Sequence, residues 1–269
     1  MKIKLLFKVI LFFLISHNQL ICKEFIILQS TTSARDSGLY DFILPDFFKK
    51  THIEVRVIAV GTGQAIKNAE RCDADVLIAH HKESEEKFLE EGYGVWRKEF
   101  MYNDFVLIGP DFDPGKVKGS YSIISALKSI SKNKINFISR GDDSGTHKKE
   151  VLLWNSSGIN PNPRNNKWYL SVGQSMGGAI NIAVNKEAYI LSDRSTWLSF
   201  KNKKKHKILV ENEPLLYNYY GVIPINPKKC PDVKFEKANI FIDWLISPET
   251  MQLISSYEID GQQLFFPIN

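Results

Sequence analysis

The sequence predicts an α/β fold with two lobes, each a mainly parallel sheet flanked by helices, and two strands that cross from one lobe to the other. Three observations predict it. Short apolar strands alternate with amphipathic helices in the first third of the chain, the same order recurs after residue 135, and two long extended segments separate the recurrences. Alternation of strands and helices is typical of parallel sheets covered by helices.

The first lobe begins with a short apolar strand at residues 25–28. Leu39, Phe42, Ile43 and Phe47 recur at helical spacing and predict a helix over residues 39–50. A second strand, a glycine turn, a second helix and a third strand follow at residues 54–60, 61–63, 64–71 and 74–79. Residues 101–109 and 216–226 are aromatic and β-branched, which predicts the two crossing strands.

The second lobe repeats this order with a strand at residues 136–139, a turn and a helix at 146–156. A segment at 168–170 and a helix ending at residue 185 follow. Helices over residues 235–246 and 248–256 are expected to return to the first lobe. We therefore expect lobe I to comprise residues 23–103 and 217–269, and lobe II to comprise residues 104–216.

Residues 1–22 resemble a secretory signal peptide, because three lysines precede the apolar run at residues 9–15 and polar residues follow it. The run is too short to span a membrane as a helix. We expect a periplasmic or otherwise extracytoplasmic protein. Cys22 leaves two alternatives open: cleavage after this residue, or attachment of a lipid to it.

Charge and cysteine content narrow the function classes. Removing residues 1–22 takes away three lysines, so the excess of 35 basic over 30 acidic residues falls from +5 to +2. Such a near-neutral protein lacks the concentrated basic face of a nucleic-acid binder. Cys72 and Cys230 remain, as one disulfide or as two thiols, and neither has the spacing of a metal site.

Three loops stand where a predicted strand gives way to a helix: STTSARDSGL, VGTGQA and SRGDDSGTHKKE, at residues 30–39, 60–65 and 139–150. In a parallel α/β sheet such loops gather at the carboxyl edge of the strands. Serine, threonine and glycine at a helix start leave backbone N–H groups free and add hydroxyl donors, which favours an anion. Arg140 adds one full positive charge that suits two oxygens of one anion.

Two alternatives accompany the anion site. Serine, threonine and aspartate before helices also serve as ordinary caps. Asp36, Asp142 and Asp143 are either first-turn acids or partners that hold Arg140, or else acceptors that would favour a protonated anion such as hydrogen phosphate.

An enzyme is the less favoured hypothesis. Ser144, His147 and Asp142 are ingredients of a hydrolytic triad, but serine and histidine would lie on one helical turn and no GxSxG motif is present. His80 and His81 are adjacent and point to different faces, so we expect them at the surface or at a strand end.

The three loops resemble those of the TupA family, the tungstate-binding components of ABC importers within the type II periplasmic binding proteins. Further matching stretches cover nearly the whole chain after residue 22, in order: DADVLIAH, EGYGVWR, MYNDFVLIGP, LLYNYYGVIPINP, FIDWLISPE and DGQQLFFP. The chain departs from the family at Ser30, where a threonine is usual, and at Cys72, where a glycine is usual.

The resemblance implies a type II periplasmic binding fold that holds the oxyanion between its lobes without changing it chemically. It implies no cofactor, a tungstate or molybdate ligand, a monomer, and a partner permease with its cytoplasmic ATPase. A phosphate receptor stays an alternative, and so does a secreted hydrolase. Whether residues 171–178 or Arg194 reach the ligand stays open. The implied ligand residues are Thr32, Ser33, Thr62, Arg140, Ser144, Gly145 and Thr146.

Overall fold

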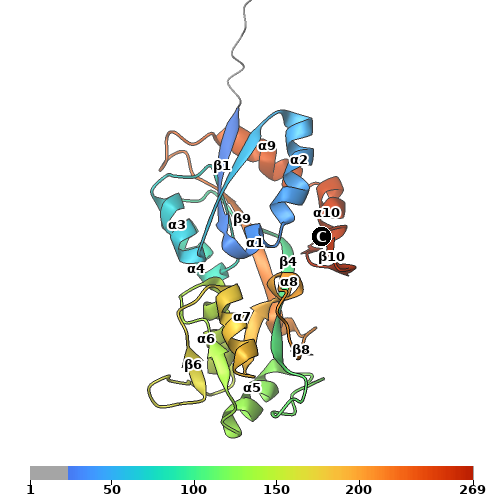
Figure 1. Cartoon of the computed structure of the whole chain (residues 1–269). Helices are drawn as coiled ribbons and strands as arrows, with labels where there is room; N and C mark the ends of the chain where they lie inside the picture. The colour runs from blue at the N-terminus through green and yellow to red at the C-terminus, as the bar shows by residue number, and fades with distance from the viewer. Residues whose placement is uncertain (1–23, 269) are drawn as a thin grey trace, which may run out of the picture.

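A computed structural model describes residues 24–268 and has the predicted two-lobed α/β fold. Residues 1–22, the expected signal peptide with Cys22, lie outside the described residues. Figure 1 shows the two lobes one above the other, with α2, α3 and α9 in the upper lobe and α5, α6 and α7 in the lower. The strands β4 and β9 run from one lobe into the other.

The upper lobe, lobe I, is built on parallel strands that become antiparallel towards the hinge. The strand order is β2-β1-β3-β9-β4, with β1 parallel to both β2 and β3, and β9 antiparallel to both β3 and β4. Its strands are β1 (Phe25–Thr31), β2 (Glu54–Val60), β3 (Val76–Ala79), β4 (Lys98–Pro110), β9 (Tyr217–Pro224), β10 (Glu258–Ile259), β11 (Gln262–Gln263) and β12 (Phe266–Pro267). Its helices are α1 (Thr32–Asp36), α2 (Leu39–Thr51), α3 (Thr62–Glu70), α4 (Lys82–Glu90), α9 (Phe235–Leu245) and α10 (Pro248–Ser255).

The lower lobe, lobe II, includes the second half of β4, which lies between β7 and β8. In this lobe β7 and β8 pair antiparallel with β4, whereas β5 is parallel to β6 and β7. Its strands are β5 (Phe137–Ser139), β6 (Tyr169–Ser171), β7 (Tyr189–Asp193) and β8 (His206–Val210). Its helices are α5 (Ile123–Lys132), α6 (Gly145–Ser156), α7 (Met176–Asn185), α8 (Arg194–Ser199) and the 3₁₀ turn η1 (Pro214–Leu216).

The hydrophobic cores separate along β4. Met101 packs into the lobe I core with Phe47, Phe241 and residues of β1 and β9, whereas Phe105 packs into the lobe II core. Leu198 of α8 joins the lobe I core although its helix follows a lobe II strand. This separation supports, as a proposal, the lobe boundaries at residues 103/104 and 216/217. No helix among residues 24–268 is both long and apolar enough to cross a membrane.

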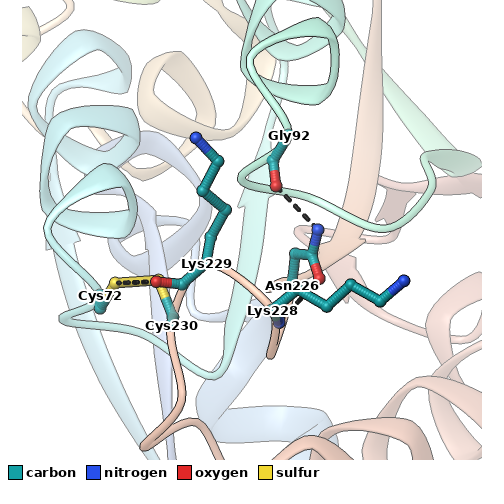
Figure 2. The surroundings of a disulfide bond; sticks show 6 residues. All are labelled: Cys72, Gly92, Asn226, Lys228, Lys229 and Cys230. Atoms are coloured by element: carbon teal, nitrogen blue, oxygen red, sulfur yellow. Dashed lines mark hydrogen bonds between the residues drawn. A yellow bond between two sulfur atoms is a disulfide. The ribbon is translucent and has the colours of Figure 1, made fainter.

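A disulfide joins Cys72, just after α3, to Cys230, after β9, with their Cα atoms 5.3 Å apart. Sequence left the choice between a disulfide and two thiols open. Figure 2 shows the bond beside the loop that carries Lys229, and Asn226 in the same loop donates to the carbonyl of Gly92 (2.8 Å). Cys72 has a φ of 65°, a left-handed conformation that favours glycine. The cysteine therefore occupies a position whose backbone suits the family's glycine.

Candidate functional site: an oxyanion cavity between the lobes

A cavity of about 450 Å³ lies where helices of both lobes begin. All seven residues implied as ligands line this one cavity, although they come from three loops far apart in sequence. Their placement agrees with the rule that strand-to-helix loops gather at the carboxyl edge of the strands. Their roles as ligands stay a prediction. They are Thr32, Ser33, Thr62, Arg140, Ser144, Gly145 and Thr146.

Three helices of nine or more residues point their N-termini at the cavity: α3, α6 and α7, whose first residues are Thr62, Gly145 and Met176. None has an acidic residue in its first turn, and the caps of α3 and α7 make no side-chain bond to the helix. Away from the cavity, α2, α4, α9 and α10 each carry an acid there, whereas α5 does not. The first turns of α3 and α7 are thus left without a protein anion, and at α6 Asp142 accepts the backbone N–H of the cap residue Ser144 (3.3 Å).

Two buried donors in the cavity wall have no partner among the described residues: the hydroxyl of Thr62 and the Nε of Arg140. Thr62 is 1% exposed and Arg140 is 9% exposed. The other side of the Arg140 guanidinium is held, because Nη2 donates to Asp142 (2.5 Å) and Nη1 to Thr146 Oγ1 (3.4 Å). A buried unpaired donor costs free energy, so both groups fit a ligand oxygen.

Asp142 forms an ion pair with Arg140, which is the alternative in which the aspartate holds the arginine in place. Asp142 does not line the cavity. Burial tends to raise the pKa of Asp142, but the Ser144 hydroxyl and the Arg140 charge outweigh it and hold that pKa below its usual value. Asp36 lines the cavity but is half exposed and paired with Arg35 (2.8 Å). Asp36 and Asp142 are therefore paired with cations within their own loops.

The ingredients of a hydrolytic triad do not form one. Ser144 directs its hydroxyl to Asp142 Oδ1 (2.7 Å), and its oxygen accepts the backbone N–H of His147 (3.3 Å). The Nδ1 of His147 accepts from the backbone of Asp143 (3.1 Å). Neither contact prepares the serine as a nucleophile with the imidazole as its base. The Ser144 hydroxyl thus caps α6 and donates to Asp142, and the role of Ser144 as a ligand stays a prediction.

Sequence analysis missed two titratable residues of the cavity, His80 and Asp193. His80 lies at the end of β3, as expected of a strand-end histidine, and burial lowers its pKa to about 4. The imidazole is therefore neutral at pH 7. Asp193 ends β7 and caps α8, where its carboxylate accepts from Thr196 N (2.8 Å), Thr196 Oγ1 (2.8 Å) and Ser195 Oγ (2.7 Å).

The two lobes approach each other closely where His80 of lobe I meets Gly145 of lobe II. A Cβ added at Gly145 would lie 2.3 Å from Cε1 of His80, far inside ordinary contact. Gly145 does not have a positive φ, so its backbone conformation alone does not require glycine. Absence of a side chain at the start of α6 is instead what lets the imidazole approach the helix.

Sequence left open whether residues 171–178 and Arg194 reach the ligand, and the structure places these two differently. Within residues 171–178, the segment Ser175, Met176 and Gly177 lines the cavity at the start of α7. Arg194 does not line it. Its guanidinium forks the carboxylate of Asp104 (2.8 and 2.6 Å) and reaches Glu211 (2.7 Å) beside the crossing strands. Within residues 24–268, no cluster of three or more histidines, cysteines and acids is arranged to hold a metal ion.

Comparisons with known proteins agree with the architecture. The family model of the PBP superfamily domain matches residues 22–249. The tungstate-binding protein TupA of Peptoclostridium acidaminophilum is 47% identical, over 91% of this chain and 86% of the relative. The solved TupA of Desulfovibrio alaskensis G20 is 42% identical with a TM-score of 0.83, covering 91% of this chain and 99% of that one. The solved tungstate ABC transporter protein of Geobacter sulfurreducens is 45% identical with a TM-score of 0.79, covering 87% and 99%. The chain thus belongs, as its loop motifs predicted, to the PBP superfamily and within it to the TupA family of tungstate-binding proteins.

Proposed function

We propose that this chain is the extracytoplasmic substrate-binding protein of an ABC importer and that it captures tungstate as its tetrahedral oxyanion. The observation that supports this most directly is the pair of buried, unpartnered donors, Arg140 Nε and Thr62 Oγ1, in a cavity onto which three helix N-termini open. A dianion supplies the acceptors that these donors lack and the negative charge that the helix dipoles favour.

Each lobe contributes part of the shell around the anion. Thr32, Ser33 and Thr62 come from lobe I, and Arg140, Gly145 and Thr146 come from lobe II. The anion satisfies all of its oxygens only when the lobes lie together, so binding and closure are one event. The two strands β4 and β9 form the hinge, and the permease with its ATPase would recognise the closed form.

Several finer features belong to the same proposal. Residues 1–22 act as a signal peptide, the mature protein works as a monomer in the periplasm or its equivalent, and it needs no cofactor. Tungsten enters as its oxyanion and not as a free cation. Molybdate has the same charge and shape as tungstate, and the names of the relatives support tungstate.

Isothermal titration calorimetry with tungstate, molybdate, sulfate and phosphate tests the proposal. We expect tungstate to bind, and Arg140→Ala to weaken binding by more than about 1.5 kcal/mol, the lower range for a charge-assisted hydrogen bond. Arg164→Ala is the matched control, because Arg164 is exposed and lies outside the cavity. Equal affinities of the wild type and Arg140→Ala would reject Arg140 as a ligand. Absence of binding with all four anions would reject the function.

Asp193 favours one second candidate, a receptor for a protonated oxyanion such as hydrogen phosphate. Its carboxylate lines the cavity and could accept a proton from the ligand. Against this, three donors of α8 already occupy its oxygens. Phosphate that binds more tightly than tungstate, and loses that preference in Asp193→Asn, would favour this candidate.

A further inference from the structure

His80 lies at the junction of the ligand loop, the hinge strands and the opposite lobe. Its Nε2 is 3.1 Å from the hydroxyl oxygen of Ser33, one of the implied ligands. Its ring packs against Tyr220 of β9, with ring centroids 4.9 Å apart. The anion-binding role of the cavity does not by itself explain a neutral, half-buried histidine in this position.

A chain of polar contacts runs from the hinge to the ring that packs against His80. Asn103 of β4 and Asn218 of β9 face each other where the strands cross, and Asn218 Nδ2 donates to Asn103 Oδ1 (2.8 Å). Asn103 Nδ2 donates in turn to the hydroxyl of Tyr220 (3.3 Å). Tyr220 is fully buried, and its ring lies against the imidazole that contacts Ser33.

The hydroxyl of Ser33 has one proton and two lone pairs to distribute. Its protein neighbours are Thr31 Oγ1 (3.1 Å) and His80 Nε2 (3.1 Å). If Thr31 and His80 both donate to Ser33, both lone pairs are used and the serine proton is free to turn to the cavity.

The alternative tautomer has the opposite consequence. A neutral imidazole carries one N–H, so an unprotonated Nε2 would accept the Ser33 proton and leave the cavity without that donor. The imidazole is neutral at pH 7, since burial lowers its pKa to about 4. The position of one proton on His80 thus decides whether Ser33 can donate to an anion.

We propose that His80 is a positioning residue for the anion: it donates from Nε2 to Ser33 Oγ and thereby directs the Ser33 hydroxyl proton at the bound oxyanion. The inference rests on the proposed anion-binding function of the cavity. It extends the site to a residue that does not need to touch the ligand, and it ties the orientation of a ligand group to the hinge strand β9 through the ring of Tyr220.

A double-mutant cycle in tungstate affinity tests the coupling. We expect His80→Leu and Ser33→Ala each to weaken binding about tenfold, the equivalent of one hydrogen bond, and the double variant to be no weaker than Ser33→Ala alone. His80→Gln, whose amide can donate to Ser33, should stay within about threefold of the wild type. Circular dichroism and melting temperatures of the ligand-free variants check that each is folded.

A second measurement reports the proton itself. In protein labelled with ¹⁵N-histidine, tungstate should place His80 in the Nε2–H tautomer, with the signal assigned by its absence in His80→Gln. An Nδ1–H tautomer in the bound state, or single effects that add in the double variant, would overturn the inference while leaving the anion-binding function intact. Absence of binding of all four anions to the wild-type protein would reject both the proposed function and this inference.

Discussion

The close approach of His80 and Gly145 makes one substitution unusually informative. Gly145→Ala adds a single methyl group at the start of α6, where alanine suits the helix and the backbone conformation is ordinary. In the structure that methyl carbon would lie 2.3 Å from His80 Cε1 and 3.1 Å from both ring nitrogens. Since these atoms belong to different lobes, the clash opposes closure and not the folding of either lobe.

The magnitude follows from the geometry. Ordinary contact begins at 3.4 Å, so the lobes or the ring must move apart by about 1 Å. Overpacking by one methyl group costs about 1–3 kcal/mol, which corresponds to roughly 5–150-fold in affinity if the cost falls on the closed state. The ligand-free protein can open to avoid the methyl, so its melting temperature should stay close to that of the wild type.

Calorimetry with tungstate and thermal melts of the ligand-free protein measure the two quantities separately. Gly63→Ala is the matched control, because it adds a methyl in the first turn of α3, where the nearest atom is Lys148 Nζ at 3.9 Å. We expect weaker binding for Gly145→Ala alone. Equal tungstate affinities for the two variants would refute the reasoning, as would a loss of ligand-free stability as large as the loss of affinity.

Three further predictions concern stability. Burial raises the pKa of Glu150 to about 7, so the folded state keeps a proton that the unfolded chain loses above about pH 4.5, and stability falls as the pH rises towards 7. Glu150→Gln should remove this decline, which is on the order of 3 kcal/mol between pH 5 and pH 8 in the free energy of unfolding measured with urea. An equal change with pH in the wild type and in Glu150→Gln would contradict this prediction. Replacing Cys72 and Cys230 together by serine should lower the free energy of unfolding by about 2–5 kcal/mol. The double variant Cys72→Gly with Cys230→Ser should lose about 1 kcal/mol less, because glycine suits the φ of 65° at position 72. Equal stabilities of the two double variants would contradict the backbone argument. Arg194→Ala leaves the buried carboxylate of Asp104 unpaired and should lower the free energy of unfolding by about 3–5 kcal/mol in the same assay, whereas a loss below 1 kcal/mol would show that water replaces the guanidinium.

Much of the cavity could be predicted from sequence because its ligand loops follow a topological rule. The loops at residues 30–39, 60–65 and 139–150 each end a strand, so their hydroxyl-rich turns had to meet at one edge of the sheets. Helix boundaries were less accurate: α3 begins at Thr62 and not at residue 64, which brings the threonine itself into the first turn. The motif was recognised correctly although the start of its helix was not.

His80 and Asp193 were missed for different reasons. His80 follows a predicted strand, so the same rule places it at the cavity, but a strand-end histidine by itself does not distinguish a cavity position from a surface position. Asp193 ends β7, a strand that was not identified in the sequence. The pairing of Cys72 with Cys230 could not be predicted either, since it depends on β3 and β9 lying side by side across 158 residues.

The disulfide also has a consequence for the order of assembly. The strands β1, β2 and β3 leave the ribosome early, but β9, which completes their sheet, is synthesised much later. Cys72 cannot form its disulfide until Cys230, 158 positions further along the chain, has been synthesised. Lobe II, in contrast, arises from one uninterrupted stretch, and its hydrophobic cores need no residue beyond 216. Cross-linking of the nascent sheet is therefore confined to the last stage of chain delivery, and an oxidising environment is needed only once the C-terminal quarter has arrived.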